Sequence, residues 1–392
     1  MKLRIYRKEF LERFKLAVSA AAKKDRPILQ NIKVKADVDG VKLYALGDNL
    51  EVYFAIGVKC DVLELGDALL PGKTFSKLLE SLKDDTFILT VHDFRIELEG
   101  KSGSLRLDSQ SADDFPDILD FEESSYTEVT TANLLKLFRR TMFAVDKDQA
   151  SFRSELKGLS LEMDNAIINA VGSTGSSLAW QQAPCCSIGG HECNANISIP
   201  VSGLKLLEKS LKIKIPLLGG ASDIVKISVI DNTCWIVFKD DARDVQVRMR
   251  LLASKFPGWR EVVQKVISCK NKAQVIVKSG LLLAELKTLA ATLSSASPYI
   301  IFKCKANVLE LRGGSSHSES VEGQADSNSS KISVPAVCSG EAEFAIKPAH
   351  LIEFLTFFEK NTSLTFNISD DHNLWIEDND GLIFVAMLYS VP

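Results

Sequence analysis

The stretch LPGKTFSKLLESLKDDTFILTVHDFRIELEG, residues Leu70–Gly100, contains a pattern from which the secondary structure of this chain can be predicted. Four of its apolar residues have the i, i+3, i+4, i+7 spacing of one buried helix face, namely Phe75, Leu78, Leu79 and Leu82. Further along, the period changes to two, and apolar residues alternate with charged ones at Phe94, Ile96 and Leu98. The stretch therefore predicts a short amphipathic helix followed by half-buried strands.

The same order of features recurs twice later in the chain. A proline beside a helix start, an apolar helical stripe and two alternating strands occupy Ile199–Lys212 with Asp223–Asp241, and again Ile346–Asn379. A second set of helices precedes these, starting at Arg7, Thr131 and Lys278. Repeats at long, regular intervals indicate one structural unit used several times. We predict an α+β fold of three similar domains, each with two helices and antiparallel sheets, at 1–124, 125–262 and 263–392.

One stretch interrupts the third repeat. Residues Gly313–Lys331 read GGSSHSESVEGQADSNSSK, a composition of serine, glycine and acidic residues that is typical of a flexible surface loop. We interpret it as an insertion, since the third repeat is longer than the second by about this length.

Charge is distributed unevenly along this acidic chain. The formal net charge is −4, yet the six predicted helices with their flanks hold 22 Lys and Arg residues against 9 Asp and Glu residues. Solvated helix faces often carry lysine, but this tendency does not explain why the acidic residues concentrate outside the helices. A positive helical surface on an acidic protein favours a polyanionic partner held on one face. The sequence contains no basic strand with interleaved aromatics, so it predicts phosphate contacts without base readout.

The rest of the composition narrows the class of protein. The first residues, MKLRIYRKEF, lack the apolar core of a signal peptide, and no apolar run is long enough for a transmembrane helix. Eight cysteines without a compact framework of spacings favour reduced thiols. We therefore expect a cytoplasmic protein.

Two motifs contain residue types that occur in metal sites or in phosphate-binding loops. Cys185, Cys186, His191 and Cys193 fall in one loop, but they lack a paired CxxC spacing, so reduced thiols are favoured over a zinc site. The GSTGSS run at 172–177 lacks the lysine of a phosphate-binding loop. The sequence shows no catalytic constellation and no cofactor motif, which predicts a non-enzymatic protein. A metal-dependent hydrolase that uses the cysteine loop remains the alternative class.

Several segments, in their order along the chain, resemble the bacterial DNA polymerase III beta subunit, or beta sliding clamp, family. They are RPILQNIKVKAD (Arg26–Asp37), LYALGDNLEV (Leu43–Val52), DDFPD (Asp113–Asp117), LKGLSLE (Leu156–Glu162), GSTGSSLA (Gly172–Ala179), KFPGWREV (Lys255–Val262) and VAMLYSVP (Val385–Pro392). The resemblance covers nearly the whole chain. It implies a head-to-tail dimeric ring with helices lining the pore and sheets outside.

The resemblance also implies a function and its partners. A sliding clamp encircles double-stranded DNA without sequence specificity and tethers the replicative polymerase, the clamp loader and repair proteins. Together with the charge pattern, it points to a set of DNA-contacting residues: Lys23, Lys24, Arg26, Lys77, Arg139, Arg140, Lys205, Lys209 and Lys212. The ring interface would match Leu105 with Thr292 and Leu293 of the second subunit.

The family further has an apolar pocket that captures short peptides of its partners. The matching positions are Leu156, Ser173, Gly175, Ser176, Ser177, Leu178, Pro257, Val262, Asn373, Val385, Met387, Leu388 and Tyr389. Two places depart from the family pattern: Ser176-Ser177 replaces the usual His-Arg pair, and Met387-Leu388-Tyr389 replaces Met-Pro-Met. These departures point to a different preferred peptide, to a second clamp of its organism, or to a clamp-like scaffold that no longer loads on DNA.

Overall fold

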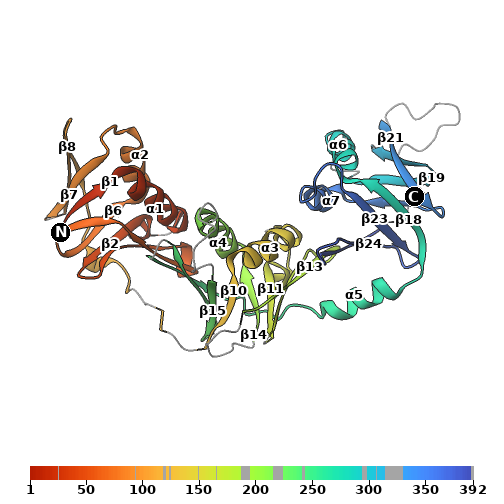
Figure 1. Cartoon of the computed structure of the whole chain (residues 1–392), viewed down its shortest axis with the longest axis horizontal. Coiled ribbons are helices and arrows are strands. Elements are labelled where there is room, and N and C mark those ends of the chain that lie inside the picture. The colour runs from red at the N-terminus through yellow and green to blue at the C-terminus, as the bar shows by residue number, and fades with distance from the viewer. Residues whose placement is uncertain are drawn as a thin grey trace. The chain divides into compact units, whose positions relative to one another are not determined.

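The structure is a computed structural model of the chain, and it separates into two compact units that are described one at a time (Figure 1). The described residues are 1–24, 26–92, 94–117, 121–122, 125–148, 150–164, 166–186, 195–214, 224–240, 243–293, 298–305, 307–313 and 330–389. Unit 1 comprises 1–135, 162–168 and 184–253, and unit 2 comprises 136–161, 169–183 and 254–392.

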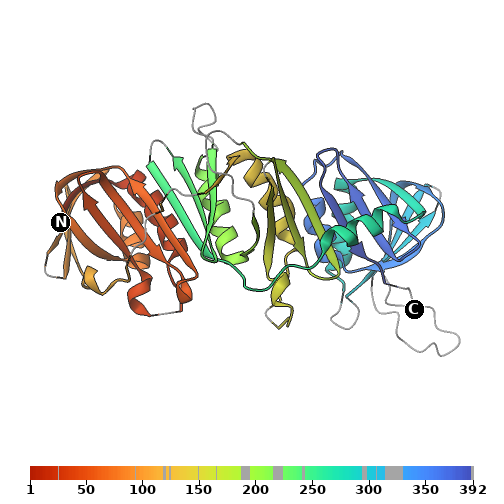
Figure 2. The same ribbon diagram turned by 90° about the horizontal axis from the view of Figure 1, so that it is seen from below.

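Unit 1 is built on an eight-stranded antiparallel sheet, whose strands are seen in Figure 2. Its order is β10 (Thr127–Thr130), β15 (Ile224–Ile230), β16 (Thr233–Asp240), β17 (Arg243–Arg250), β4 (Val52–Val58), β3 (Gly40–Leu46), β2 (Asn31–Asp37) and β6 (Gly66–Pro71). The pairing of β17 with β4, with Val247 opposite Phe54, joins strands from the first and second repeats. The sheet is therefore continuous across the predicted boundary at residue 124.

Three helices pack on this sheet within unit 1. They are α1 (Arg7–Ala20), α2 (Gly72–Ser81) and α4 (Val201–Lys214), and we call them the helical layer. α1 contacts both other helices and lies against β2, β3 and β4, while α2 contacts β6 and α4 contacts β17 (Figure 1). The buried faces are those of the apolar stripes, because Phe75, Leu79 and Leu204 are fully buried. Most of the described lysines of the three helices are exposed, whereas Arg13 of α1 is buried.

A second, five-stranded sheet completes the N-terminal part of unit 1. Its order is β5 (Cys60–Glu64), β1 (Lys2–Tyr6), β7 (Thr86–His92), β8 (Arg95–Gly100) and β9 (Gly103–Asp108). Ile96 and Leu98 are buried on β8 as the alternation predicts, but Phe94 is 60% exposed. The expectation for Phe94 was wrong because its backbone adopts φ +63° in the turn before β8, which takes its side chain out of the strand alternation.

Unit 2 contains the other large antiparallel sheet. From β13 onward its order is β13 (Ser177–Pro184), β25 (Ile383–Met387), β24 (Asn373–Glu377), β23 (Ser363–Ser369), β18 (Asn271–Lys278), β21 (Ser330–Ser339), β20 (Val308–Gly313), β19 (Ile300–Lys305) and β22 (Glu343–Ile346). β11 (Gly158–Asp164), β12 (Ile167–Ser173) and α3 (Thr131–Thr141) begin in one unit and end in the other, and β14 (Ala195–Pro200) belongs to unit 1.

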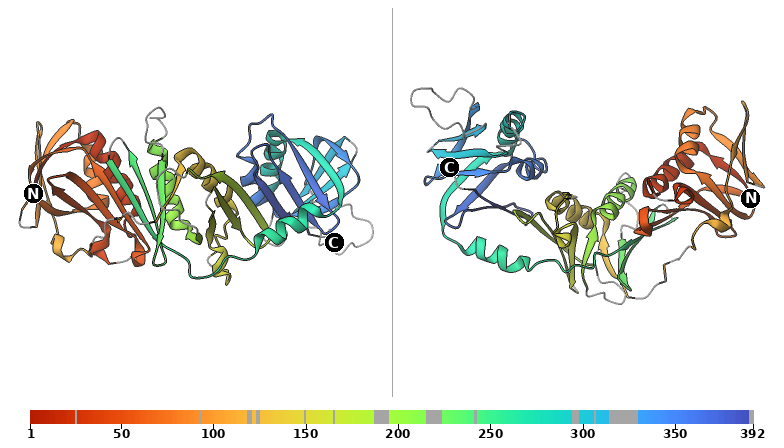
Figure 3. Two further views of the ribbon diagram at one scale, coloured as in Figure 1. Left: turned by 60° about the horizontal axis from the view of Figure 1, so that its bottom comes forward. Right: turned by 180° about the vertical axis from the view of Figure 1, so that it is seen from behind.

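Helices α6 (Ser279–Ala290) and α7 (Pro348–Leu355) lie side by side in unit 2. A third helix, α5 (Trp259–Ser268), stands apart from them and leads into β18 (Figure 3). The core is rich in aromatic rings: Phe354 stacks on Phe384 at 4.8 Å, and Phe143 lies 5.8 Å from Phe384. Phe143 belongs to the second repeat and Phe384 to the third, so this core spans the predicted boundary at residue 262.

All six predicted helices are present, which confirms the helical part of the sequence interpretation. Helix α5 was not predicted, although Trp259, Val263 and Val266 have helical spacing and are buried. The two domain boundaries, at residues 124 and 262, remain a prediction. The insertion at 313–331 lies almost wholly outside the described residues, with only Gly313 at the end of β20 and Ser330 and Lys331 in β21 described. Within the described part of the chain, no helix is both long and apolar enough to cross a membrane.

Candidate functional site

A pocket of about 580 Å³ in unit 2 brings most of the predicted peptide-binding residues together. This volume is within the range of ordinary small-ligand pockets. Eleven of the thirteen predicted residues line it: Leu156, Ser173, Gly175, Ser176, Ser177, Leu178, Pro257, Val262, Asn373, Val385 and Met387. Seven further lining residues were not predicted, namely Arg153, Glu155, Phe256, Gly258, Trp259, Lys265 and Val266.

One wall of the pocket is a pair of antiparallel strands, β13 and β25. Ser177 lies opposite Ala386, and Leu178 lies opposite Val385. Since side chains alternate across a strand, Val385 and Met387 line the pocket while Ala386 is buried in the core on the other side. The pocket therefore depends on two chain segments that are about 200 residues apart.

Leu388 and Tyr389 do not line the pocket, contrary to the prediction. Leu388 follows the strand alternation and is buried in the same core as Ala386. Tyr389 pairs with Ala345 at the edge strand β22, and its ring lies 4.6 Å from that of Tyr299. The tail residues thus anchor the last strand to the sheet.

Helix α5 forms a second wall. Trp259 is almost completely buried at its start, with its ring 5.0 Å from that of Trp180, which fixes the helix against β13. Val262 is 49% exposed and Met387 is 52% exposed, although both are apolar pocket residues. Exposed apolar side chains gathered in a hollow with a polar rim suit the capture of a partner's apolar side chains.

The rim is a tight turn from Ser173 to Ser177. Ser173 Oγ accepts a hydrogen bond from the Gly175 amide and donates to the Ser177 carbonyl, which fixes the turn. Gly175 has φ +86°, and a Cβ there would collide with Nη1 of Arg153. The absence of a side chain at Gly175 thus lets the Arg153 guanidinium lie against the turn at the pocket's edge. The serines of the GSTGSS run act in turn formation.

The predicted DNA-contacting residues of unit 1 lie mostly on the helical layer. Lys77 on α2, and Lys205 and Lys209 on α4, have exposed side chains. Lys23, Lys24 and Arg26 follow α1 and are also exposed, and the amides of Lys23 and Lys24 both donate to Asp48 Oδ1 at 3.0 Å. The side chain of Lys212 lies outside the described residues.

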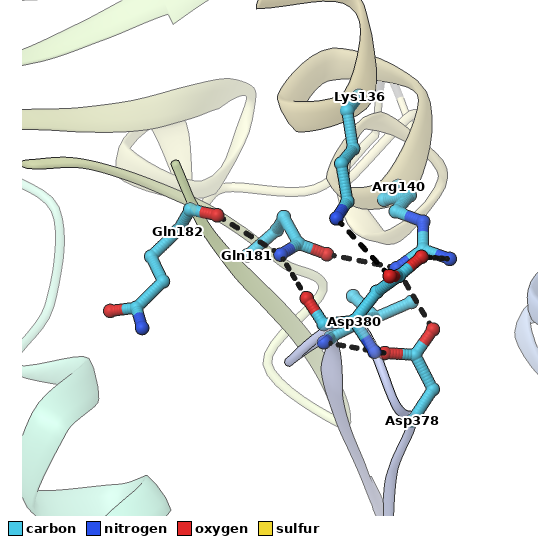
Figure 4. Close-up of polar contacts among 7 residues, drawn as sticks. Lys136, Arg140, Gln181, Gln182, Asp378 and Asp380 are labelled. Carbon is cyan, nitrogen blue, oxygen red and sulfur yellow. Dashed lines mark hydrogen bonds and ion pairs between the residues drawn. The ribbon is translucent and has the colours of Figure 1, made fainter. Parts of the chain in front are cut away.

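In unit 2 the two neighbouring arginines of α3 differ. Arg139 is exposed, but the Arg140 side chain is only 15% exposed and forms ion pairs with Asp378 at 2.8 Å and Asp380 at 3.2 Å (Figure 4). A guanidinium held by two carboxylates is not available to a phosphate, so the prediction that Arg140 contacts DNA does not agree with this geometry. Sequence alone placed both residues in one basic cluster because it does not show which carboxylates fold against them.

The predicted interface residues are found at two places. In unit 1, Leu105 is 40% exposed on β9, the edge strand of the five-stranded sheet. In unit 2, Thr292 and Leu293 follow the end of α6, where the Thr292 hydroxyl donates to the Leu289 carbonyl. Their role in closing a ring stays a prediction.

The cysteine loop offers little to a metal ion in its described part. His191 and Cys193 lie outside the described residues, and no group of three or more metal-ligating side chains occurs among the residues that are described. Burial, the neighbouring Cys186 and Asp164 raise the pKa of Cys185 to about 11. Without a metal, this thiol is therefore protonated at neutral pH.

Comparison with known proteins agrees with this geometry. Residues 1–120 match the family described as DNA polymerase III beta subunit, N-terminal domain. The beta sliding clamp of Chlamydia muridarum is 23% identical over 371 residues, which cover 92% of this chain and 91% of that protein. A DNA polymerase III beta subunit from Thermotoga maritima is 21% identical and superposes with a TM-score of 0.82, covering 100% of both chains.

The chain is thus similar over nearly its whole length to beta sliding clamps. A further beta sliding clamp structure, from Pseudomonas aeruginosa in complex with griselimycin, is 18% identical and has a TM-score of 0.83, with 100% of both chains covered. These likenesses confirm the predicted α+β clamp fold. The matching family model and the solved structure from Thermotoga maritima both carry the name of the DNA polymerase III beta subunit.

Proposed function

We propose that this chain is a processivity factor of the replicative DNA polymerase, a clamp that encircles duplex DNA and tethers other proteins to it. The observation that carries the proposal is the segregation of charge in unit 1. Exposed lysines gather on the solvent face of the helical layer, while the chain as a whole has a net charge of −4. A surface of this kind attracts a polyanion without reading its sequence.

In this proposal two chains close a ring around DNA. The ring is retained on the DNA because it is closed, while it can still slide along the duplex. Lys77, Lys205 and Lys209 supply weak, hydrated contacts to phosphates, which permit sliding. Such contacts contribute affinity that falls steeply with salt. A closed ring keeps the protein on DNA even when these contacts are weak.

The pocket of unit 2 is the proposed docking site for peptides of the polymerase, the clamp loader and repair proteins. Its apolar lining residues, together with the charged lining residues Arg153, Glu155 and Lys265, suit a short apolar segment flanked by polar residues. This chain should prefer a different peptide from that of other clamps. The serine pair at the rim and the position of Leu388 in the core support this preference.

The first test of the ring is the solution mass of the full chain, measured by light scattering without DNA. A dimer of twice the 43.1 kDa chain mass is the expected result. A monomer at micromolar concentration would contradict unaided ring closure and would leave a clamp-like scaffold that binds partners only.

A further inference from the structure

Arg140 lies at the centre of a polar cluster in unit 2, together with Lys136, Gln181, Asp378 and Asp380; we call these five residues the Arg140 cluster (Figure 4). Arg140 Nη1 is 2.8 Å from Asp378 Oδ2 and also donates to Gln181 Oε1 at 3.1 Å. Arg140 Nη2 is 3.2 Å from Asp380 Oδ2, and Lys136 Nζ is 3.7 Å from Asp380 Oδ1. Helix α3 is thereby tied to the turn between β24 and β25.

The centre of the cluster is buried and well paired, whereas Lys136 and Asp380 at its edge are 33% and 59% exposed. The side chains of Arg140 and Asp378 are 15% and 7% exposed, and Gln181 is fully buried. Gln181 Nε2 donates to the carbonyls of Gln182 and Asp380 at 3.0 Å, which adds β13 to the same network. Removing one partner of such a pair leaves an uncompensated buried charge, so each member depends strongly on the others.

The cluster and the pocket sit at opposite ends of one short ladder. β13 and β25 share four residue pairs, from Ser177 with Ala386 to Trp180 with Ile383. The pocket uses the first end of the ladder, where Leu178 lies opposite Val385. Gln181 and the Asp378–Leu382 turn follow the other end directly. At ~3.3 Å per residue, the two sites are on the order of 10 Å apart along the strands.

β25 also pairs with β24 at five residue pairs, and the cluster holds the turn that joins these two strands to α3 and β13. Because the pocket has residues from both strands, its width depends on how β25 lies against β13. A loss of the cluster would free the turn, and the strands would separate from that end toward Leu178 and Val385.

We propose that Arg140 is a positioning residue for partner binding: through the Arg140 cluster it holds β25 against β13 and so sets the shape of the pocket. This inference rests on the proposed function, because it takes the pocket as a peptide site. Arg140 does not line that pocket. Its effect on a bound peptide is therefore indirect and acts through the strands that it positions.

The test compares variants that break the cluster with a neighbour that does not. Arg140→Met removes the guanidinium. Asp378→Asn removes the ion pair but retains Oδ1, which accepts the amides of Asp380 and Leu382 and maintains the turn. Arg139→Met, one residue away on α3 and exposed, is the matched control. Thermal melts and near-ultraviolet circular dichroism verify that each full-length variant is folded.

The probe is a fluorescein-labelled peptide selected by display on the wild-type chain, whose binding is lost in Val262→Asp. We expect Arg140→Met and Asp378→Asn to weaken its binding on the order of tenfold, as is typical of residues coupled through one network. Arg140→Lys should recover part of the affinity, and Arg139→Met should bind as the wild type does.

Hydrogen exchange supplies a readout without ligand. The Met387 amide donates to the Ser176 carbonyl at 2.8 Å, at the pocket end of the ladder. This amide should exchange faster in both cluster variants than in the wild type. In Arg139→Met its exchange rate should equal that of the wild type. Wild-type affinity and wild-type exchange at Met387 in a folded Arg140→Met or Asp378→Asn would overturn the inference. If selection yields no peptide that depends on Val262, the proposed function fails instead, and the exchange result still decides whether the cluster holds the ladder.

Discussion

Leu178 and Val385 lie opposite each other on β13 and β25, and both line the pocket of unit 2. The two residues are separated by more than half of the chain, yet they form one residue pair of a ladder. A peptide bound here would contact both strands at once. The affinity of the site therefore reports on the pairing of these two segments as well as on the side chains at its surface.

The apolar pocket residues with the greatest exposure should be replaceable without loss of stability. Val262→Asp and Met387→Asp each place a charge where the side chain is half exposed, so the melting temperature should change little. Binding of a partner peptide should fall at least ~30-fold, because a carboxylate would be desolvated against an apolar ligand. Fluorescence anisotropy measures the affinity. Wild-type affinity in both variants would exclude this pocket as the docking site.

The two pocket glycines should respond differently to alanine. Gly175 has φ +86° and Arg153 beside it, so Gly175→Ala should destabilise the chain by ~1 kcal/mol or more and displace the guanidinium. At Gly258 a new Cβ meets only Glu261 Oε2 at 4.0 Å, and the backbone has φ −64°. Gly258→Ala is the matched control and should be close to neutral in urea unfolding. Equal effects at both sites would contradict the role given to Gly175.

Charge reversal on the helical layer should weaken DNA binding. In Lys205→Glu/Lys209→Glu two exposed cations of α4 become anions, so duplex affinity should fall and its dependence on salt should become shallower by about one unit of slope per lost phosphate contact. Lys59→Glu/Lys101→Glu, two exposed changes outside the helices, alters the net charge by the same amount and is the control. An equal loss in the control would mean that overall charge, and not the helical layer, governs binding.

The stability of unit 2 should depend on pH through His350. Burial is the main cause that lowers the pKa of His350 below its usual 6.5; nearby Lys147 acts in the same direction, while Glu353 opposes it. The unfolded chain therefore binds this proton more readily than the folded chain, so stability falls as the pH drops below about 6.5. His350→Gln should lose less of its melting temperature than the wild type between pH 7.5 and pH 5.5. Parallel losses would show that His350 does not contribute.

The elements of this fold follow from sequence because each has a strong local period. The stripes of Phe75 with Leu79 and of Leu351 with Phe354 predict their helices directly, and all of these side chains are buried. Phe94 was misplaced because one residue of positive φ moves a side chain out of the strand pattern, and sequence alternation does not reveal such a turn. Helix α5 was missed because the predicted domain boundary at residue 262 falls inside its ten residues.

The pocket was predictable only in part, since its shape depends on long-range pairing. Eleven of the residues matched by resemblance line the pocket, and their role in peptide binding stays a prediction, whereas strand alternation buries Leu388 in the core. The ion pairs of Arg140 could not be predicted for the same reason. Its neighbours in sequence suggested a DNA contact, but its partners Asp378 and Asp380 are more than 230 residues away. Local sequence carries no record of such partners.

The most direct test of an encircling clamp is retention on DNA with blocked ends. The protein is threaded onto linear duplex that carries biotin at both ends, streptavidin then closes the ends, and the DNA is washed in high salt, which removes purely electrostatic binders. The account predicts that protein stays on the blocked duplex and leaves when a restriction enzyme cuts it in the middle. Complete release in the high-salt wash, before any cut, would contradict a ring around DNA.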